Sequence, residues 1–235
     1  SLPRLPDEPL IFVEVAFTTA MADSITPLLD EAGEPADPAR SSTAIFYSIS
    51  NTQPGLKGVS FGDSLIKRVV ETLRAEFPRL KTFATLSPMP GFRAWLSRHA
   101  ADLLARTPQK TRDELARSLG AQPLTAQAML AALEDLPALE LKSPLRHWLL
   151  QCGAQYLGRE LADGKPLDAV ARFHLGNGAR VERLNWAADP SAKGIRQSCG
   201  LMVNYLYDLG RLDRHRTQLA QGRIPVSSAT AALFF

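Results

Sequence analysis

Two apolar segments near the start of the chain have the composition of β-strands. Residues 10–17 (LIFVEVAF) are mostly β-branched or aromatic, with a single charged residue, and this predicts a central strand. Residues 43–50 (TAIFYSIS) are largely apolar on both faces, so we expect a second strand that is covered on both sides. Between the two, the pattern predicts a short helix over residues 21–29 and a loop over residues 30–42.

Residues 53–92 carry the most informative pattern, which predicts a glycine-rich loop, one amphipathic helix and one short strand. The apolar residues of this helix fall on one face and are Ile66, Val69, Val70, Leu73 and Phe77. Gly62 and Asp63 are expected to open the helix, because a carboxylate suits its positive end, and Pro78 is expected to end it. Residues 81–86 then form the strand.

The glycine-rich loop has the features of an anion site. Gly55, Gly58 and Gly62 remove side chains where a backbone turns tightly or lets a ligand approach. A loop that runs into a helix N-terminus offers unpaired N–H groups and a positive dipole end to a phosphate. We therefore hypothesise a pyrophosphate site over residues 53–63. The loop matches neither G-x-x-x-x-G-K-[ST] nor G-x-G-x-x-G, so an ordinary strand-to-helix turn is the alternative.

Ser87 follows the third predicted strand and precedes Pro88. A residue before proline avoids the helical region, so Ser87 is expected to be extended. Its hydroxyl would lie at the carboxyl end of a strand, where ligands gather in open α/β sheets. The G-x-S-x-G sequence of a hydrolase nucleophile is missing. Ser87 therefore positions a substrate carboxylate or hands on a proton, or it simply forms the turn before Pro88.

From residue 92 onward, the sequence predicts a helical block followed by more strands. Residues 92–106 have a helical pattern, and residues 108–158 have two or three more helices, which look like an insertion at about residues 108–160. The part of this block that resembles a helix-turn-helix has no Lys or Arg in its second helix, residues 124–136, which argues against contact with nucleic acid.

The remaining elements complete a mixed α/β domain. Residues 179–188 predict a strand, and residues 189–198 a short helical turn. Residues 200–207 (GLMVNYLY) fit either a final strand or an apolar helix, and residues 209–221 predict a helix.

His174 has the most loop-like setting of the four histidines, in the sequence HLGNG. Histidine is the usual general acid or base near neutral pH, but a hydrogen-bonded histidine at a strand end fits the sequence equally well. The other histidines are expected on helices, as solvated or capping residues: His99, His147 and His215. Tyr205 and Tyr207 alternate along the last strand, if it is one, so Tyr207 faces either a pocket or the core. Cys199 is expected to be a buried structural thiol.

Composition narrows the function classes. The chain has 235 residues, enough for one large domain or two small ones, and its net charge of +3 is too small to indicate nucleic acid. Two cysteines give neither a disulfide framework nor a metal site, which favours a reducing, cytoplasmic compartment. No apolar run approaches the roughly 18 residues that cross a membrane. The start at Ser1, without an initiator methionine, suggests a fragment.

Six segments, in order, resemble the malonyl-CoA decarboxylase family in its catalytic domain. They run from about residue 44 to residue 207 and so cover most of the chain. The segments are AIFYSISNTQPGLKGVSFG, LIKRVVETL with EFP, LSPMPGF, LDAVARFHLGNGA, R-x-NW-x-AD and SCGLM-x-NY-x-Y. Their shared order makes the resemblance more specific than any one motif.

The resemblance implies a fold and an activity. The fold is α/β (α+β), with the mixed twisted sheet of the acyl-CoA N-acyltransferase (GNAT-like) type, whose splayed central strands hold acyl-CoA. The implied reaction converts malonyl-CoA to acetyl-CoA and carbon dioxide, with no metal, biotin or other cofactor. A preceding helical domain that takes part in self-association is also implied, and hence a homo-oligomer. Two alternatives stay open, an acyl-CoA N-acyltransferase on the same fold and a non-catalytic acyl-CoA-binding module.

The resemblance also implies site residues. Ser87 and His174 match the serine and histidine regarded as the catalytic pair of the family, and Tyr207 matches a further active-site tyrosine. The residues that match the CoA-binding segment are Ser50, Asn51, Gln53, Gly55, Leu56, Gly58, Val59, Gly62 and Asp63. Backbone N–H groups around residues 48–51 are expected to stabilise the enolate, because strand pairing must open there to admit the thioester.

Overall fold

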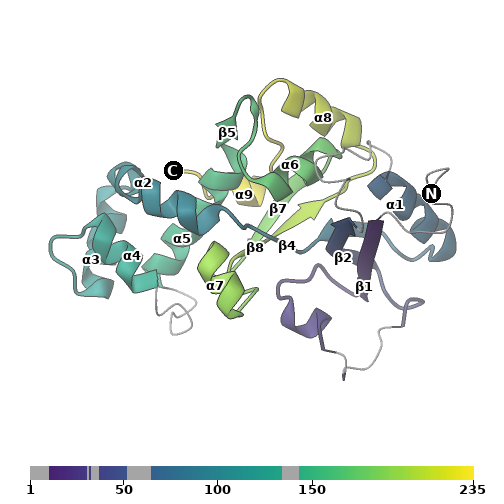
Figure 1. Cartoon of the computed structure of the whole chain (residues 1–235), viewed down its shortest axis with the longest axis horizontal. Coiled ribbons are helices and arrows are strands. Elements are labelled where there is room, and N and C mark those ends of the chain that lie inside the picture. Colours follow the sequence, from purple (N-terminus) through teal and green to yellow (C-terminus); the bar gives the residue numbers. More distant parts are fainter. Residues whose placement is uncertain (1–10, 31, 33–36, 52–64, 134–142) are drawn as a thin grey trace.

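The computed structural model describes residues 11–30, 32, 37–51, 65–133 and 143–235 (Figure 1). The predicted glycine-rich loop, residues 53–63, lies outside these residues. Of the predicted CoA-binding residues, Ser50 and Asn51 belong to a strand whose backbone is described, whereas their side chains are not.

The sheet of this protein is mixed. Its strands are β1 (Ile11–Thr18), β2 (Thr43–Asn51), β3 (Thr82–Thr85), β4 (Ser87–Pro88), β7 (Arg180–Asn185) and β8 (Met202–Leu206). β1 pairs antiparallel with β2, and β2 pairs parallel with β3. β3 and β4 pair antiparallel with successive parts of β8, whose other edge pairs antiparallel with β7. The predicted mixed α/β class is therefore confirmed.

The helices of the helical block gather at one end of the molecule, whereas the other described helices are spread around the sheet (Figure 1). Those of the helical block are α2 (Phe92–Arg106), α3 (Gln109–Leu119), α4 (Ala126–Ala132) and α5 (Pro144–Gly158). The others are α1 (Leu65–Glu76), α6 (Ala169–Gly176), α7 (Ala192–Ser198), α8 (Leu212–Ala220) and α9 (Ser228–Ala231). A short hairpin, β5 (Leu161–Ala162) with β6 (Lys165–Pro166), connects α5 to α6. In Figure 1 the block lies at one end of the molecule, and α1, β1 and β2 lie at the other.

The helical block and the sheet share one hydrophobic core. α2 packs against α4 and α5, so the block includes α2 as well as the three helices of the predicted insertion. α5 in turn packs against β7. Phe46 of β2, Trp95 of α2 and Trp148 of α5 belong to the same buried cluster. The block is thus anchored to the rest of the domain by apolar burial, which is the main stabilising contribution in folding.

The first two strands differ in how well the sequence placed them. β2 is covered on both sides as predicted, since Ala44 and Ile45, which point to opposite faces, are both fully buried. β1 was predicted to be central and is instead an edge strand that pairs only with β2 among the described residues. Its apolar run reflects packing on one face, where the Phe17 ring lies 5.0 Å from the Phe77 ring, while Phe12 is 54% exposed.

Three further predictions are decided by the backbone. Residues 21–29 contain only a single 3-10 turn, Thr26–Leu28, in place of the predicted short helix. Residues 200–207, which fit a strand or a helix, contain β8. His174 does not lie at a strand end, because α6 is a helix whose first N–H groups are capped by Asp168.

Candidate active site

The sheet opens between β2 and β4. The parallel ladder of β2 and β3 runs from Thr43 to Phe46, and the Leu86 N–H then donates to the Phe46 carbonyl at 3.1 Å. Beyond Phe46, the described part of β2 pairs only with β1. A cavity of about 580 Å³ lies in this opening. Its lining residues are Phe46, Tyr47, Ser48, Ile49, Ser87, Pro88, Ala169, Val170, Phe173, His174 and Lys193.

Ser87 reaches this cavity from β4. It is extended, as predicted, and pairs with Val203 of β8, which leaves it only 5% exposed. Its Oγ lies 2.8 Å from Thr85 Oγ1 and 3.2 Å from His174 Nε2. The hydroxyl therefore has a hydrogen-bond partner on each side and an open cavity in front of it.

His174 reaches the same cavity from the last turn of α6. Its Nδ1 lies 2.7 Å from Tyr207 Oη, so both ring nitrogens have hydrogen-bond partners. The imidazole is 4% exposed, and burial lowers its pKa from the usual 6.5 to about 3. His174 is consequently a neutral imidazole near pH 7, with one nitrogen as donor and the other as acceptor. The structure brings all three predicted catalytic residues, Ser87, His174 and Tyr207, into one buried chain.

β8 and the residue that follows it supply two tyrosines to the imidazole. The Tyr205 ring stacks on the His174 ring at 4.7 Å between centroids and 26° between planes, while Tyr207 approaches its edge. Burial raises the pKa of both phenols, so both stay protonated near neutral pH. The Tyr205 hydroxyl has no hydrogen-bond partner among the described residues. Tyr205 was not predicted as a site residue, although residues two apart on a strand share a face.

A buried carboxylate fixes the start of α6. Asp168 accepts hydrogen bonds from the Val170 and Ala171 N–H groups, both at 2.9 Å, and from the Tyr156 hydroxyl at 3.0 Å. Burial raises the pKa of Asp168, against the lowering effect of these hydrogen bonds. A Cβ on Gly91 would lie 2.5 Å from the Tyr156 hydroxyl oxygen, so a glycine is needed there. Asp168 thereby links α6 to α5 and to the segment that follows β4.

Other predicted residues fall elsewhere. Gln53, Gly55, Leu56, Gly58, Val59, Gly62 and Asp63 lie outside the described residues, so the pyrophosphate site stays a prediction. Cys199 is buried, as expected. His215 is not solvated, since it is buried and its Nδ1 lies 2.9 Å from the Gly178 carbonyl. Within the described part of the chain, no group of three His, Cys, Asp or Glu side chains could hold a metal ion. None of the described helices is long and apolar enough to cross a membrane.

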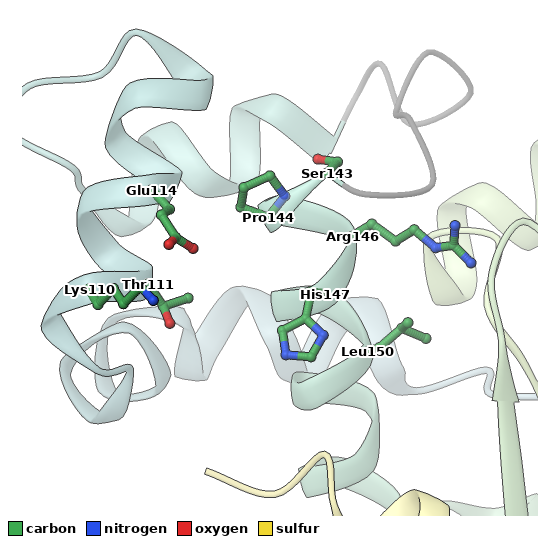
Figure 2. Close-up of a pocket in the computed structure, with 8 residues that line it drawn as sticks. All are labelled: Lys110, Thr111, Glu114, Ser143, Pro144, Arg146, His147 and Leu150. Carbon is green, nitrogen blue, oxygen red and sulfur yellow. The ribbon is translucent and has the colours of Figure 1, made fainter.

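A second cavity of similar size, about 590 Å³, lies between α3 and α5 (Figure 2). It is lined by Lys110, Thr111, Glu114, Ser143, Pro144, Arg146, His147 and Leu150. In Figure 2, Arg146 points away from α3, and its guanidinium lies 5.6 Å from the centre of the Trp186 ring. His147 is exposed, and no residue that lines this cavity is both titratable and buried. Its polar groups are therefore those of a solvated surface.

Comparisons with known proteins agree on one family. The family model described as "Malonyl-CoA decarboxylase C-terminal domain" matches residues 2–234. "Malonyl-CoA decarboxylase, mitochondrial" of Mus musculus is 41% identical over 216 residues, which are 87% of this chain and 43% of that protein. The protein of the same name from Anser anser anser is 40% identical over 217 residues, which are 87% of this chain and 42% of that protein. The chain thus spans less than half the length of these relatives.

Two crystal structures of malonyl-CoA decarboxylases have the same fold. The protein from Cupriavidus metallidurans is 48% identical with a TM-score of 0.86, and the match covers 98% of this chain and 56% of that one. The protein from Rhodopseudomonas palustris is 45% identical with a TM-score of 0.85, covering 99% of this chain and 51% of that one. The family model and these likenesses agree with the order of motifs, and the chain belongs to the malonyl-CoA decarboxylase family.

Proposed function

We propose that this chain carries the catalytic centre of a malonyl-CoA decarboxylase, a carboxy-lyase that converts malonyl-CoA to acetyl-CoA and carbon dioxide. The observation that supports this most directly is the buried chain of Ser87, His174 and Tyr207 beside the opening between β2 and β4. That opening would admit an extended thioester between the two strands. The group next to the thioester would then face Ser87 and His174.

The reaction needs three things from the protein. Loss of carbon dioxide leaves a thioester enolate, so the oxyanion must be stabilised and C2 must receive a proton, which comes overall from solvent. Backbone N–H groups of residues 48–51 would stabilise the oxyanion, since Ser48 and Ile49 line the cavity on the strand that has separated from β4. A dry site also helps, because a carboxylate that has lost its hydration releases neutral carbon dioxide more readily.

The buried dyad would act on the carboxylate and on C2. The Ser87 hydroxyl would hydrogen-bond the departing carboxylate, and His174 would orient the serine or, together with it, deliver the proton to C2. A neutral imidazole suits this role, because it both accepts and donates a hydrogen bond without adding a resident positive charge. Such a charge would stabilise the bound carboxylate and so oppose decarboxylation.

The rest of the proposal concerns the CoA part of the substrate, the oligomeric state of the protein and its location in the cell. Residues 53–63 would bind the CoA pyrophosphate, Ser50 and Asn51 would contact CoA as well, and the reaction would need no metal or other cofactor. The whole protein would be a homo-oligomer, partly through a helical domain that precedes this one, and would act in fatty acid metabolism in the cytoplasm. The curated relatives are named mitochondrial, so a measured location for this protein would decide that point.

The test is release of carbon dioxide from malonyl-CoA by the full-length protein in the absence of any amine. Release with stoichiometric formation of acetyl-CoA is the expected result. No release of carbon dioxide in this assay, together with acetyl transfer to an amine, would favour an N-acyltransferase instead. Tight CoA binding with neither activity would identify a non-catalytic acyl-CoA-binding module and overturn the proposal.

A further inference from the structure

The sheet has an interruption beside Ser87. β8 pairs with β3 at Leu206 and resumes with β4 at Val203, so two residues on each side are left out of the regular ladder. Side chains fill this gap. The Tyr205 N–H donates to Thr85 Oγ1 at 3.1 Å, and Asn204 Nδ2 donates to the Thr85 carbonyl at 2.8 Å. The Thr85 hydroxyl thus takes the place of a backbone acceptor and is held in position by the sheet.

The same hydroxyl is the outer partner of Ser87. Thr85 and Ser87 are two residues apart on an extended segment, so their side chains share a face, and the two oxygens are 2.8 Å apart. Thr85 is fully buried. Four polar groups therefore form one buried chain, in the order Thr85, Ser87, His174 and Tyr207.

Such a chain has two directions. In one, Tyr207 donates to His174 Nδ1, Nε2–H donates to Ser87, and Ser87 donates to Thr85. In the other, every bond is reversed and the proton of the imidazole lies on Nδ1. Each direction leaves one terminal hydroxyl hydrogen without a partner in the chain, that of Thr85 in the first and that of Tyr207 in the second.

The distances favour the first direction. The bond at Nδ1 is short, 2.7 Å, as when a hydroxyl is the donor, whereas the bond at Nε2 is 3.2 Å, in the longer range of N–H donors. A phenol is also a more acidic donor than an aliphatic hydroxyl, so the first direction uses the stronger donor and leaves the weaker one free. The Thr85 oxygen is then the acceptor at which the chain ends.

We propose that Thr85 is a positioning residue that, by accepting the Ser87 hydrogen, holds His174 as the Nε2–H tautomer. This inference rests on the proposed decarboxylase function for its catalytic meaning, but not for its geometry. Without an acceptor at residue 85, the best remaining acceptor for Ser87 is His174 Nε2, which requires the other tautomer. In this direction the Ser87 hydrogen points away from His174, so it would be available to the bound substrate carboxylate.

The test compares Thr85→Val with Thr85→Ser. Valine has nearly the same shape and no hydroxyl, whereas serine keeps the acceptor. In the protein labelled with nitrogen-15 at histidine, the ring nitrogen shifts distinguish the two tautomers, and His174→Asn identifies the His174 signals. We expect the Nε2–H tautomer in the wild type and in Thr85→Ser, and a shift toward Nδ1–H in Thr85→Val. We expect kcat to fall about tenfold in Thr85→Val with KM nearly unchanged, and to recover in Thr85→Ser.

A matched control separates this role from loss of a buried hydrogen bond. Thr107 is also buried, and its hydroxyl accepts a hydrogen bond from Trp148 Nε1 at 3.0 Å. This hydrogen bond lies in the helical block and involves no residue of the chain from Thr85 to Tyr207. Thr107→Val should lower stability and leave the His174 tautomer and kcat unchanged.

The possible outcomes are distinguishable. An Nδ1–H tautomer in the wild type overturns the inference by itself, even if Thr85→Val does not fold. An unchanged tautomer and kcat in a folded Thr85→Val also overturns it. A wild type with the expected tautomer but no carbon dioxide release would contradict the proposed function and leave the geometric assignment of Thr85 standing.

Discussion

Two cavities described above have nearly the same volume and each is lined by a histidine, yet their chemistry differs. In the opening between β2 and β4, His174 is buried and both of its nitrogens are hydrogen-bonded. Between α3 and α5, His147 is exposed among other solvated side chains (Figure 2). Volume alone therefore does not identify a site. Convergence of buried, titratable groups does, because burial shifts their pKa values and fixes their geometry.

The largest expected effect tests this contrast directly. Ser87→Ala and His174→Asn should each lower kcat for carbon dioxide release by about 100- to 1,000-fold, the usual loss when one donor to a developing charge is removed. CoA affinity, measured by calorimetry, should change little, because neither residue belongs to the predicted CoA-binding segment, residues 50–63. His147→Asn is the control from the other cavity and should keep kcat within about twofold. Near-normal turnover in His174→Asn would remove the catalytic role assigned to this residue.

The next effect concerns the contact between the helical block and α6. Gly91→Ala would place a Cβ 2.5 Å from the Tyr156 hydroxyl oxygen, so it should lower the free energy of unfolding by about 1–3 kcal/mol. In the Tyr156→Phe background the clashing oxygen is absent, so Gly91→Ala should lower the free energy of unfolding less there than in the wild type. Gly176→Ala, where a Cβ meets nothing within 4 Å, is the control for chemical denaturation experiments. An equal loss in the two backgrounds would show that another contact is responsible.

A smaller effect depends on pH. Burial lowers the folded-state pKa of His174 to about 3, below the unfolded value of about 6.5. The stability from this group is therefore fully present above about pH 6.5 and is lost as the pH falls toward 3. Between about pH 7.5 and about pH 5.5 it should decrease by about 1.4 kcal/mol. Urea unfolding at both pH values should show this decrease in the wild type and not in His174→Asn; equal decreases would contradict a buried neutral imidazole.

The smallest effect distinguishes the two tyrosines. Tyr205→Phe keeps the ring that stacks on His174 and removes a hydroxyl without a partner among the described residues, so kcat should change by less than about threefold. Tyr207→Phe removes the 2.7 Å hydrogen bond to Nδ1 and should lower kcat about tenfold. Steady-state kinetics of the two variants side by side would check this order, and a reversed order would give Tyr205 the polar role.

Local sequence predicted the components of the site better than their arrangement. The strand before Ser87 was predicted over residues 81–86, the extended backbone at Ser87 follows from the proline after it, and both are present. The sequence left open whether Tyr207 faces a pocket or the core, and the structure places its hydroxyl within hydrogen-bond distance of His174 Nδ1. Nothing local states that residues 87, 174 and 207 meet. Their proximity was carried by the family resemblance and is produced by the pairing of β8 with both β3 and β4.

The misplaced elements show where local patterns are insufficient. β1 was expected at the centre because its side chains are apolar, but a run of this kind also arises when one face packs on a helix and the other is partly exposed. For α6 the sequence contains a signal of a helix start: Asp168 immediately precedes an apolar segment, as helix N-caps do. Thr85 lies in none of the six family segments, and only the interruption of the sheet reveals its role. Tyr205 does lie in one of them, but only the structure shows that its ring stacks on His174.

The N-terminal cap of α6 has a consequence for how this domain can change in evolution. Asp168 ties the first turn of an eight-residue helix to α5, and the last turn carries the imidazole. The helix therefore sets a fixed distance of about 1.5 Å per residue along its axis, and each residue is rotated about that axis by about 100° relative to the one before it. Inserting or deleting one residue between Asp168 and His174 would swing the imidazole out of the cavity, even though every side chain of the site was retained. Substitutions at exposed positions of this helix are thus tolerable where changes of its length are not.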